Sequence, residues 1–224
     1  MSQSLLEVVV LSAADARAAA AGGADRVELV ADMAADGLTP DAGVFAEVRE
    51  AVEIPVRVMV RRAAGFARGV PLARLCADAE ALWRAGAREF VGGWLGEDGR
   101  VDVEACEEVL GVLPDTHWTF HRAFDHTRDR AEAWETVGAL TGVDTVLTSG
   151  AADGVAAGAA VLAADAAAAC GPRILVGGGL RAEHVGQLRA AGLDAFHIGT
   201  PARPRGWASP VDAEQVAVWR ELVG

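Results

Sequence analysis

Lysine and tyrosine are both missing from this chain of 224 residues, so all 20 of its basic residues are arginines. Without lysine there is no Schiff-base chemistry, no covalent anchor for pyridoxal phosphate and no P-loop lysine. Without tyrosine there is no phenol to act as an acid or a base. A catalytic acid or base must therefore be a histidine, an aspartate, a glutamate or a cysteine.

Cysteines are few, and long apolar runs are missing. The three cysteines, Cys76, Cys106 and Cys170, are an odd and scattered set, which predicts no disulfide framework. No apolar run approaches the roughly 18 residues that span a bilayer. The apolar segment 5–11 is short, is interrupted by Glu7 and lacks the basic flank of a signal peptide. We therefore expect a cytoplasmic protein that has no membrane partner.

Positive charge is also in deficit. The chain carries 32 acidic residues against 20 basic ones, which gives a net charge of −12. Nucleic acids and anionic membranes both bind clustered cations. We therefore expect no nucleic-acid partner, and a small anionic molecule or a metal ion becomes the expected ligand.

Short runs of β-forming residues alternate with alanine-rich helical segments along the whole chain. We predict strands near residues 5–10, 25–30, 54–60, 88–92, 117–122, 144–148, 173–177 and 194–198. We predict helices near residues 14–22, 40–52, 71–85, 103–113, 129–141, 154–169, 182–191 and 211–222. Strict alternation implies parallel strands joined by right-handed crossovers. The prediction is a single (β/α)8 TIM barrel domain over residues 1–224, with a doubly wound open sheet as the alternative.

An internal repeat supports the barrel. Before every second predicted strand, a helix ends in glycine, which is followed by a small or apolar residue and then a polar one. The four glycines are Gly23, Gly86, Gly142 and Gly192. Glycine adopts the left-handed conformation that ends a helix at little cost. The repeat therefore has the period of two strand–helix units.

Active sites of such barrels lie at the carboxyl ends of the strands. Polar residues late in the predicted strands are therefore candidates for catalysis: Glu28, Arg57, His121, Asp125 and His197. Histidine suits proton transfer near neutral pH, and Asp125 or Glu28 would orient it. The alternative for each histidine is a hydrogen-bonded core residue.

Three charged residues, Glu7, Glu28 and Arg57, fall on three neighbouring predicted strands. A charge inside an apolar strand must face the lumen or the mouth, because an unpaired buried charge is strongly destabilising. These residues form either a structural ion network or a site in which a carboxylate of altered pKa acts as a base or a metal ligand.

Glycines follow the last two predicted strands, at Gly177-Gly178-Gly179 and at Gly199. Glycine lets backbone N–H groups approach an anion closely, and the loops after strands 7 and 8 are the usual phosphate site of this fold. The alternative is a tight turn with no ligand. The candidate anion-binding residues are Arg61, Gly178, Gly179, Gly199 and Thr200.

Four segments together resemble the copper homeostasis protein CutC family. They are residues 24–29 (ADRVEL), 37–40 (GLTP), 119–125 (TFHRAFD) and 146–150 (VLTSG). The likeness runs from Leu6 to about Thr200. It implies a TIM barrel in the cytoplasm, often a homodimer or higher homo-oligomer, that binds copper.

This chain differs from the family at two positions that would be expected to bind copper. Family members often carry cysteines where this chain has Val9 and Val30. Cu(I) prefers thiolate or thioether ligands, and Met33 and Met59 supply only thioethers. Copper as the cofactor therefore rests on the resemblance alone.

Three functions remain open from the sequence. The first is copper handling, as the family implies. The second is an enzyme that uses His121, His197 and Glu28 for acid–base chemistry on a small phosphorylated or carboxylated metabolite, with Arg57 as an anion clamp. The third is an inert or partner-binding scaffold. A divalent metal held by Glu28 and His121 is compatible with the enzyme.

Overall fold

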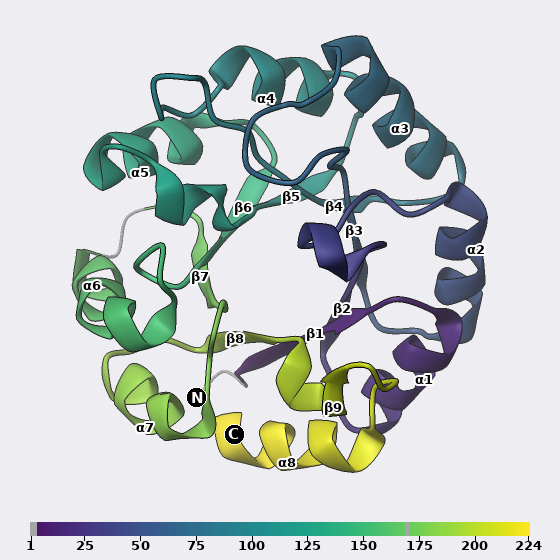
Figure 1. The fold of residues 1–224 in the computed structure, drawn as a ribbon, viewed down its shortest axis with the longest axis vertical. Coiled ribbons are helices and arrows are strands. Elements are labelled where there is room, and N and C mark those ends of the chain that lie inside the picture. Colours follow the sequence, from purple (N-terminus) through teal and green to yellow (C-terminus); the bar gives the residue numbers. More distant parts are fainter. Residues whose placement is uncertain (1–3, 169–170) are drawn as a thin grey trace.

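The computed structural model describes residues 4–168 and 171–224. In these residues eight parallel strands close into a barrel in the order of the chain, with helices on the outside (Figure 1). The predicted TIM barrel is confirmed. No helix in the described part of the chain is long and apolar enough to cross a membrane.

The elements follow the predicted alternation closely. The barrel strands are β1 (Leu5–Val10), β2 (Arg26–Leu29), β3 (Val56–Met59), β4 (Glu89–Gly92), β5 (His117–Phe120), β6 (Val143–Thr148), β7 (Arg173–Val176) and β8 (Ala195–Ile198). The helices are α1 (Ala13–Ala21), α2 (Ala42–Ala51), α3 (Leu72–Arg84), α4 (Val103–Gly111), α5 (Arg130–Ala139), α6 (Val155–Ala168), α7 (Ala182–Ala190) and α8 (Ala213–Val223). The predicted end of the sixth helix at residue 169 and Cys170 lie outside the described residues.

The glycines of the repeat precede β2, β4, β6 and β8 as predicted. Gly23, Gly86, Gly142 and Gly192 have φ angles of 89°, 105°, 87° and 92°. These values lie in the left-handed region, which is strained for residues with a Cβ atom. The repeat therefore marks the sharp turn from each of these helices into the next strand.

Four short elements were not predicted, and all of them follow carboxyl ends of barrel strands. They are η1 (Met33–Ala35), η2 (Arg122–His126), η3 (Thr200–Ala202) and β9 (Pro204–Trp207). The prediction extended the fifth strand to residue 122, whereas β5 ends at Phe120. It ends there because the side chain of His121 accepts a hydrogen bond from the N–H of Ala123 and starts the turn of η2.

The barrel interior is separate from the main core. The main core lies between the strands and the helices, where Leu6, Val8 and Val10 of β1 are buried. Alternate residues face the lumen. There, one apolar cluster contains Val9 and Val30 with Met59 and Val91, and another contains Leu147, Leu175 and Ala195. Buried charged residues lie in the same lumen, and they form the site described next.

Candidate functional site

A cavity of about 470 Å³ opens at the carboxyl ends of the strands. Eight of the predicted site residues line it: Glu28, Arg61, His121, Gly178, Gly179, His197, Gly199 and Thr200. Val9, Val30, Met33 and Met59 line it as well. The structure therefore brings most of the predicted site together, and Arg57 and Asp125 are the exceptions.

Arg57 lies near the opposite end of the barrel. Its Nε donates to Glu89 Oε2 at 3.1 Å, and its Nη2 donates to both carboxylate oxygens of Asp144 at 2.8 and 2.9 Å. Glu89 begins β4, and Asp144 is the second residue of β6. The expectation that Arg57 clamps an anion at the mouth is therefore wrong, because two carboxylates hold its guanidinium near the amino ends of the strands.

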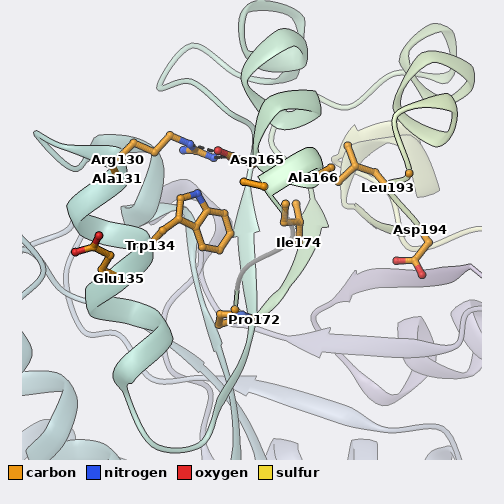
Figure 2. Close-up of a pocket in the computed structure, with 13 residues that line it drawn as sticks. Arg130, Ala131, Trp134, Glu135, Asp165, Ala166, Pro172, Ile174, Leu193 and Asp194 are labelled. Atoms are coloured by element: carbon orange, nitrogen blue, oxygen red, sulfur yellow. Dashed lines mark hydrogen bonds and ion pairs between the residues drawn. The ribbon is translucent and has the colours of Figure 1, made fainter.

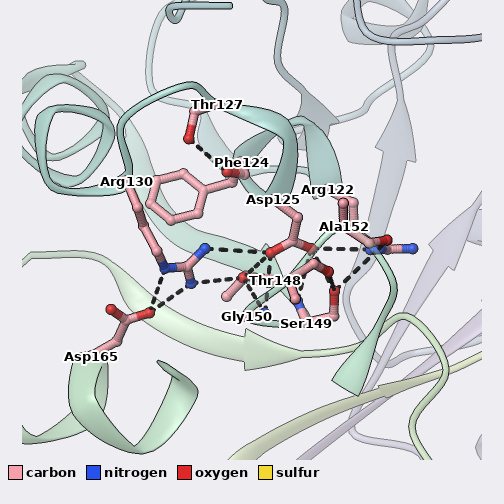
Figure 3. A network of polar contacts seen from close by, with 11 residues as sticks. Arg122, Phe124, Asp125, Thr127, Arg130, Thr148, Ser149, Gly150, Ala152 and Asp165 are labelled. Carbon is pink, nitrogen blue, oxygen red and sulfur yellow. Dashed lines mark hydrogen bonds and ion pairs between the residues drawn. The ribbon is translucent and has the colours of Figure 1, made fainter. Parts of the chain in front are cut away.

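Asp125 also differs from the prediction. Its side chain is completely buried and accepts hydrogen bonds from the hydroxyl of Thr148, from the N–H and hydroxyl of Ser149 and from the N–H of Gly150 (Figure 3). Arg122 and Arg130 donate to it too. It contacts neither His121 nor His197 in the described part of the chain. Asp125 therefore holds the end of β6 in place and does not orient a catalytic histidine.

A buried chain of polar contacts runs from Glu7 to the cavity. His197 Nδ1 lies 2.8 Å from Glu7 Oε1, and His197 Nε2 lies 3.6 Å from Glu28 Oε2. Arg26 donates to the other oxygen of Glu7. Glu7 pairs with His197 in the register between β1 and β8. Glu7 was not among the predicted catalytic residues, because only barrel closure brings the first and last strands together.

This arrangement separates the pKa values of the two glutamates. Burial opposes ionisation of Glu7, but Arg26 and His197 outweigh it and lower its pKa to about 2. Burial, with a contribution from the negative charge of Glu7, raises the pKa of Glu28 to about 7. Burial disfavours the charged form of His197, but Glu28 and Glu7 raise its pKa overall. Near neutral pH, both forms of the Glu28 carboxyl are therefore accessible beside His197.

His121 is held in one neutral form. Its Nδ1 accepts the N–H of Ala123 at 3.3 Å, so in the neutral ring the hydrogen is on Nε2. Burial, and then the positive charge of Arg61, lower the pKa of His121 to about 3. The ring of Phe66 packs edge-on against it, with 5.8 Å between centroids. At neutral pH His121 is therefore a hydrogen-bond donor and not a cation.

Two polar atoms at the cavity have no partner in the described part of the chain. One is Glu28 Oε1 and the other is His121 Nε2, and both are shielded from bulk solvent. A buried polar atom without a hydrogen bond destabilises a protein by about 1–3 kcal/mol. A bound molecule that offers a donor to Glu28 and an acceptor to His121 would satisfy both atoms.

Arg61 is a buried cation that forms no ion pair with the described residues. Only 4% of its surface is exposed, and its N–H groups donate to the carbonyl oxygens of Asp36, Gly37 and Gly65. Burial lowers its pKa, although arginine remains charged at neutral pH. The carboxylates of Asp36 and Glu28 act on it without forming an ion pair, so its charge favours an anion in the cavity.

Arg122 is a second cation at the cavity, and it was not among the predicted site residues. Its Nε donates to Asp125 at 3.1 Å, and its Nη2 donates to the hydroxyl of Ser149 at 3.1 Å. It lies so close to Gly178 that a Cβ atom there would be 2.5 Å from its Nε. Its Nη1 donates to none of the described residues. Arg122 therefore presents a fixed donor beside the glycine loop after β7.

The donor atoms in the cavity do not fit a tight copper site. Val9 and Val30 line it where thiols would be needed, and Met33 and Met59 offer only thioethers. The Nε2 of His121 carries a hydrogen and offers no lone pair to a metal. Within residues 4–168 and 171–224, no group of three or more His, Cys, Asp and Glu side chains is arranged to hold a metal ion.

The described cysteines lie elsewhere. Cys76 on α3 and Cys106 on α4 are free and buried in the helix layer. Burial raises the pKa of both thiols, that of Cys106 to about 12. These thiols are therefore protonated at neutral pH and are poor metal ligands.

A larger cavity of about 670 Å³ lies outside the barrel wall, between α5, α6 and β7 (Figure 2). Trp134 and Ile174 form part of its apolar lining. Its charged residues Arg130 and Asp165 pair with each other at 2.6 Å. It contains none of the predicted site residues, and its arginine is already paired with Asp165. The smaller cavity at the mouth is therefore the candidate site.

The neutral form of His121 predicts a specific dependence of stability on pH. The unfolded chain binds a proton at His121 as the pH falls through 6.5, whereas the folded chain does not until about pH 3. This contribution to stability is present above pH 6.5 and is lost as the pH falls towards 3. Between pH 7.5 and 5.0 the wild type should lose roughly 2 kcal/mol more unfolding free energy than His121→Gln.

Urea unfolding at the two pH values measures this difference. His117→Gln is the matched control, because His117 begins β5, the strand that ends just before His121, and its side chain is exposed at the other end of the barrel. An equal loss in the wild type and in His121→Gln would show that His121 is protonated in the folded protein.

Comparisons with known proteins agree with this fold. The CutC family model matches residues 4–201. A CutC family protein of Klebsiella pneumoniae (strain 342) is 37% identical over 195 residues, covering 86% of this chain and 78% of the relative. The human copper homeostasis protein cutC homolog is 40% identical over 148 residues, covering 65% of this chain and 54% of the relative. The crystal structure of CutC from Streptococcus agalactiae superposes with a TM-score of 0.80 at 26% identity, covering 88% of this chain and 99% of that one. The chain belongs to the CutC family.

Proposed function

We propose that this protein is an enzyme that performs acid–base chemistry on a small carboxylated or phosphorylated metabolite at the mouth of the barrel. One observation carries the proposal: Glu28 is 4% exposed, its pKa is raised to about 7, and its Oε1 is unpartnered among the described residues. A general acid or base works best when its pKa is near the working pH. Glu28 meets this condition, whereas an ordinary glutamate does not.

The partners of Glu28 support a proton-transfer role. His197 faces one oxygen of Glu28 and is itself held by Glu7. When Glu28 releases its proton, His197 can take it up, and the ionised Glu7 stabilises the imidazolium. In a purely structural ion pair, the carboxyl would be fully ionised at neutral pH, whereas a pKa near 7 leaves Glu28 about half protonated.

The charges at the mouth support an anionic substrate. Arg61 contributes an unpaired positive charge, and Arg122 contributes a free Nη1. The positive φ angles of Gly178 and Gly179, 87° and 74°, turn the backbone after β7 at the cavity wall. Their N–H groups donate to no residue in the described part, so they are available to a phosphate or carboxylate. Gly199 and Thr200 line the same wall.

Copper handling is the second candidate function, and the two thioethers in the cavity favour it. Met33 and Met59 line the mouth, and the name of the human relative refers to copper homeostasis. Thioethers bind Cu(I), but without thiolates the site would be weak. We therefore propose that copper is a low-affinity ligand of this chain. Family membership also supports a cytoplasmic location and a homodimer or higher homo-oligomer.

A thermal-shift screen with phosphorylated and carboxylated metabolites tests the enzyme proposal. A ligand at 100 times its Kd adds about 2.7 kcal/mol, which raises the Tm of a chain of this size by roughly 5–10 °C. Arg61→Met should abolish the shift because it removes the unpaired charge. Glu28→Gln should keep the shift and lose turnover.

Arg128→Met is the control for loss of an arginine, because Arg128 lies outside the cavity with its side chain 45% exposed. A screen in which no metabolite raises the Tm would remove the support for an enzyme.

A Cu(I) titration against a competing chelator tests the copper proposal. The wild type should bind weakly, and Met33→Leu with Met59→Leu should abolish that binding. Val9→Cys with Val30→Cys should bind at least about 100-fold more tightly, because it adds two thiolates to one apolar cluster. If the wild type bound Cu(I) as tightly as the cysteine variant, the proposal that copper is a low-affinity ligand of this chain would be contradicted.

A further inference from the structure

We infer that the reaction at the mouth is the removal of a proton from a carbon atom next to a carbonyl group. Glu28 is the base, and neutral His121 donates a hydrogen bond to the carbonyl oxygen of the substrate. The substrate class is small hydroxy- or oxo-acids and hydroxycarbonyl phosphates. This inference rests on the proposed function and narrows it to one reaction class.

The hydrogen bond that His121 already makes indicates which kind of substrate group its other nitrogen would bind. The N–H of Ala123 occupies Nδ1, so Nε2–H is the group that remains for a ligand. A donor in this position calls for an acceptor, such as a carbonyl oxygen. Neutral imidazole is the form that polarises a carbonyl without giving up its proton, and an anionic oxygen formed there would strengthen the hydrogen bond.

The reaction also needs a proton acceptor, and Glu28 is the group that provides it. Its Oε1 has no partner among the described residues, whereas its Oε2 faces His197. The Glu28 and His121 side chains both line the same cavity. In the inferred step, Glu28 takes a carbon-bound proton while the carbonyl oxygen of the substrate accepts a hydrogen bond from His121.

The step is balanced without any co-reactant. Glu28 takes the proton, and the electron pair of the C–H bond forms a C=C bond. The π electrons of the carbonyl move onto its oxygen, which His121 Nε2–H stabilises. Glu28 then returns the proton to the same carbon, or, in a hydroxycarbonyl substrate, to the former carbonyl carbon after the hydroxyl hydrogen of the enediolate has moved to the other oxygen. The product is the substrate with an exchanged hydrogen or its hydroxycarbonyl isomer, and no external oxidant or reductant is needed.

The remaining residues that line the cavity indicate the charge and size of the substrate. Arg61 and Arg122 favour one carboxylate or phosphate group, and Gly178 lies against Arg122. Val9 and Met59 form an apolar part of the wall. A volume of about 470 Å³ suits a small molecule. A short carbon skeleton with one anionic end matches this cavity.

Proton exchange with solvent tests the inference directly. The protein is incubated in D2O with a panel of hydroxy- and oxo-carboxylates and hydroxycarbonyl phosphates of roughly two to six carbons. Proton NMR then follows the loss of the C–H signals next to the carbonyl group. We expect the protein to accelerate exchange in at least one compound, with a rate that rises with pH around a midpoint near 7 as Glu28 ionises.

Variants assign the two roles. Glu28→Gln should lower the exchange rate by about 100- to 10,000-fold because it removes the base. His121→Ala should lower it by about 100- to 1,000-fold because it removes the donor. His121→Gln, which keeps a neutral N–H donor, should restore part of the rate. His117→Gln is the control and should leave the rate unchanged.

The failure of this inference is distinguishable from failure of the proposed function. If panel compounds raise the Tm but none exchanges its C–H proton, the reaction class is overturned while an anion-binding acid–base site stands. If no compound raises the Tm, both fail. If His121→Gln loses as much activity as Glu28→Gln, His121 carries a proton and its role as a neutral donor is overturned.

Discussion

The contact between His197 Nδ1 and Glu7 Oε1, at 2.8 Å, joins the last strand of the barrel to the first. It determines which nitrogen of His197 faces Glu28, and Arg26 keeps Glu7 ionised on its other side. Burial is the main cause of the raised pKa of Glu28; the charge of His197 opposes it, and the negative charge of Glu7 adds to it. Because barrel closure brings both His197 and Glu7 to Glu28, the pKa of Glu28 depends on how the barrel closes as well as on its burial.

The two ends of the barrel use charge differently. Near the amino ends of the strands, Arg57 is held by Glu89 and Asp144, so its charge is compensated within the protein. At the carboxyl ends, Arg61 has no ion pair in the described part of the chain, and two buried polar atoms lack partners. A charge that is paired within the protein stabilises the fold, whereas unpaired polar groups beside a cavity are suited to a ligand.

Much of the fold and site could be predicted from the sequence, because β-forming runs and helix-ending glycines mark each strand. The positions of Glu28, His121 and His197 at the mouth followed from their late places in those strands. Arg57 could not be placed this way, because its height in the barrel depends on the stagger between strands. Asp125 was misassigned because η2 turns its carboxylate towards the end of β6. Arg122 follows His121 directly in the sequence, but its free Nη1 depends on that same turn and could not be predicted.

The most direct test of this account is the titration of Glu28. Carbon-13 NMR of protein labelled at the glutamate side-chain carboxyls follows each group through the pH range, and Glu28→Gln assigns the signal. The account predicts that the Glu28 carboxyl titrates with a midpoint near 7. A midpoint near 4.5, the ordinary value for glutamate, would contradict it, because Glu28 would then be a permanently ionised structural residue.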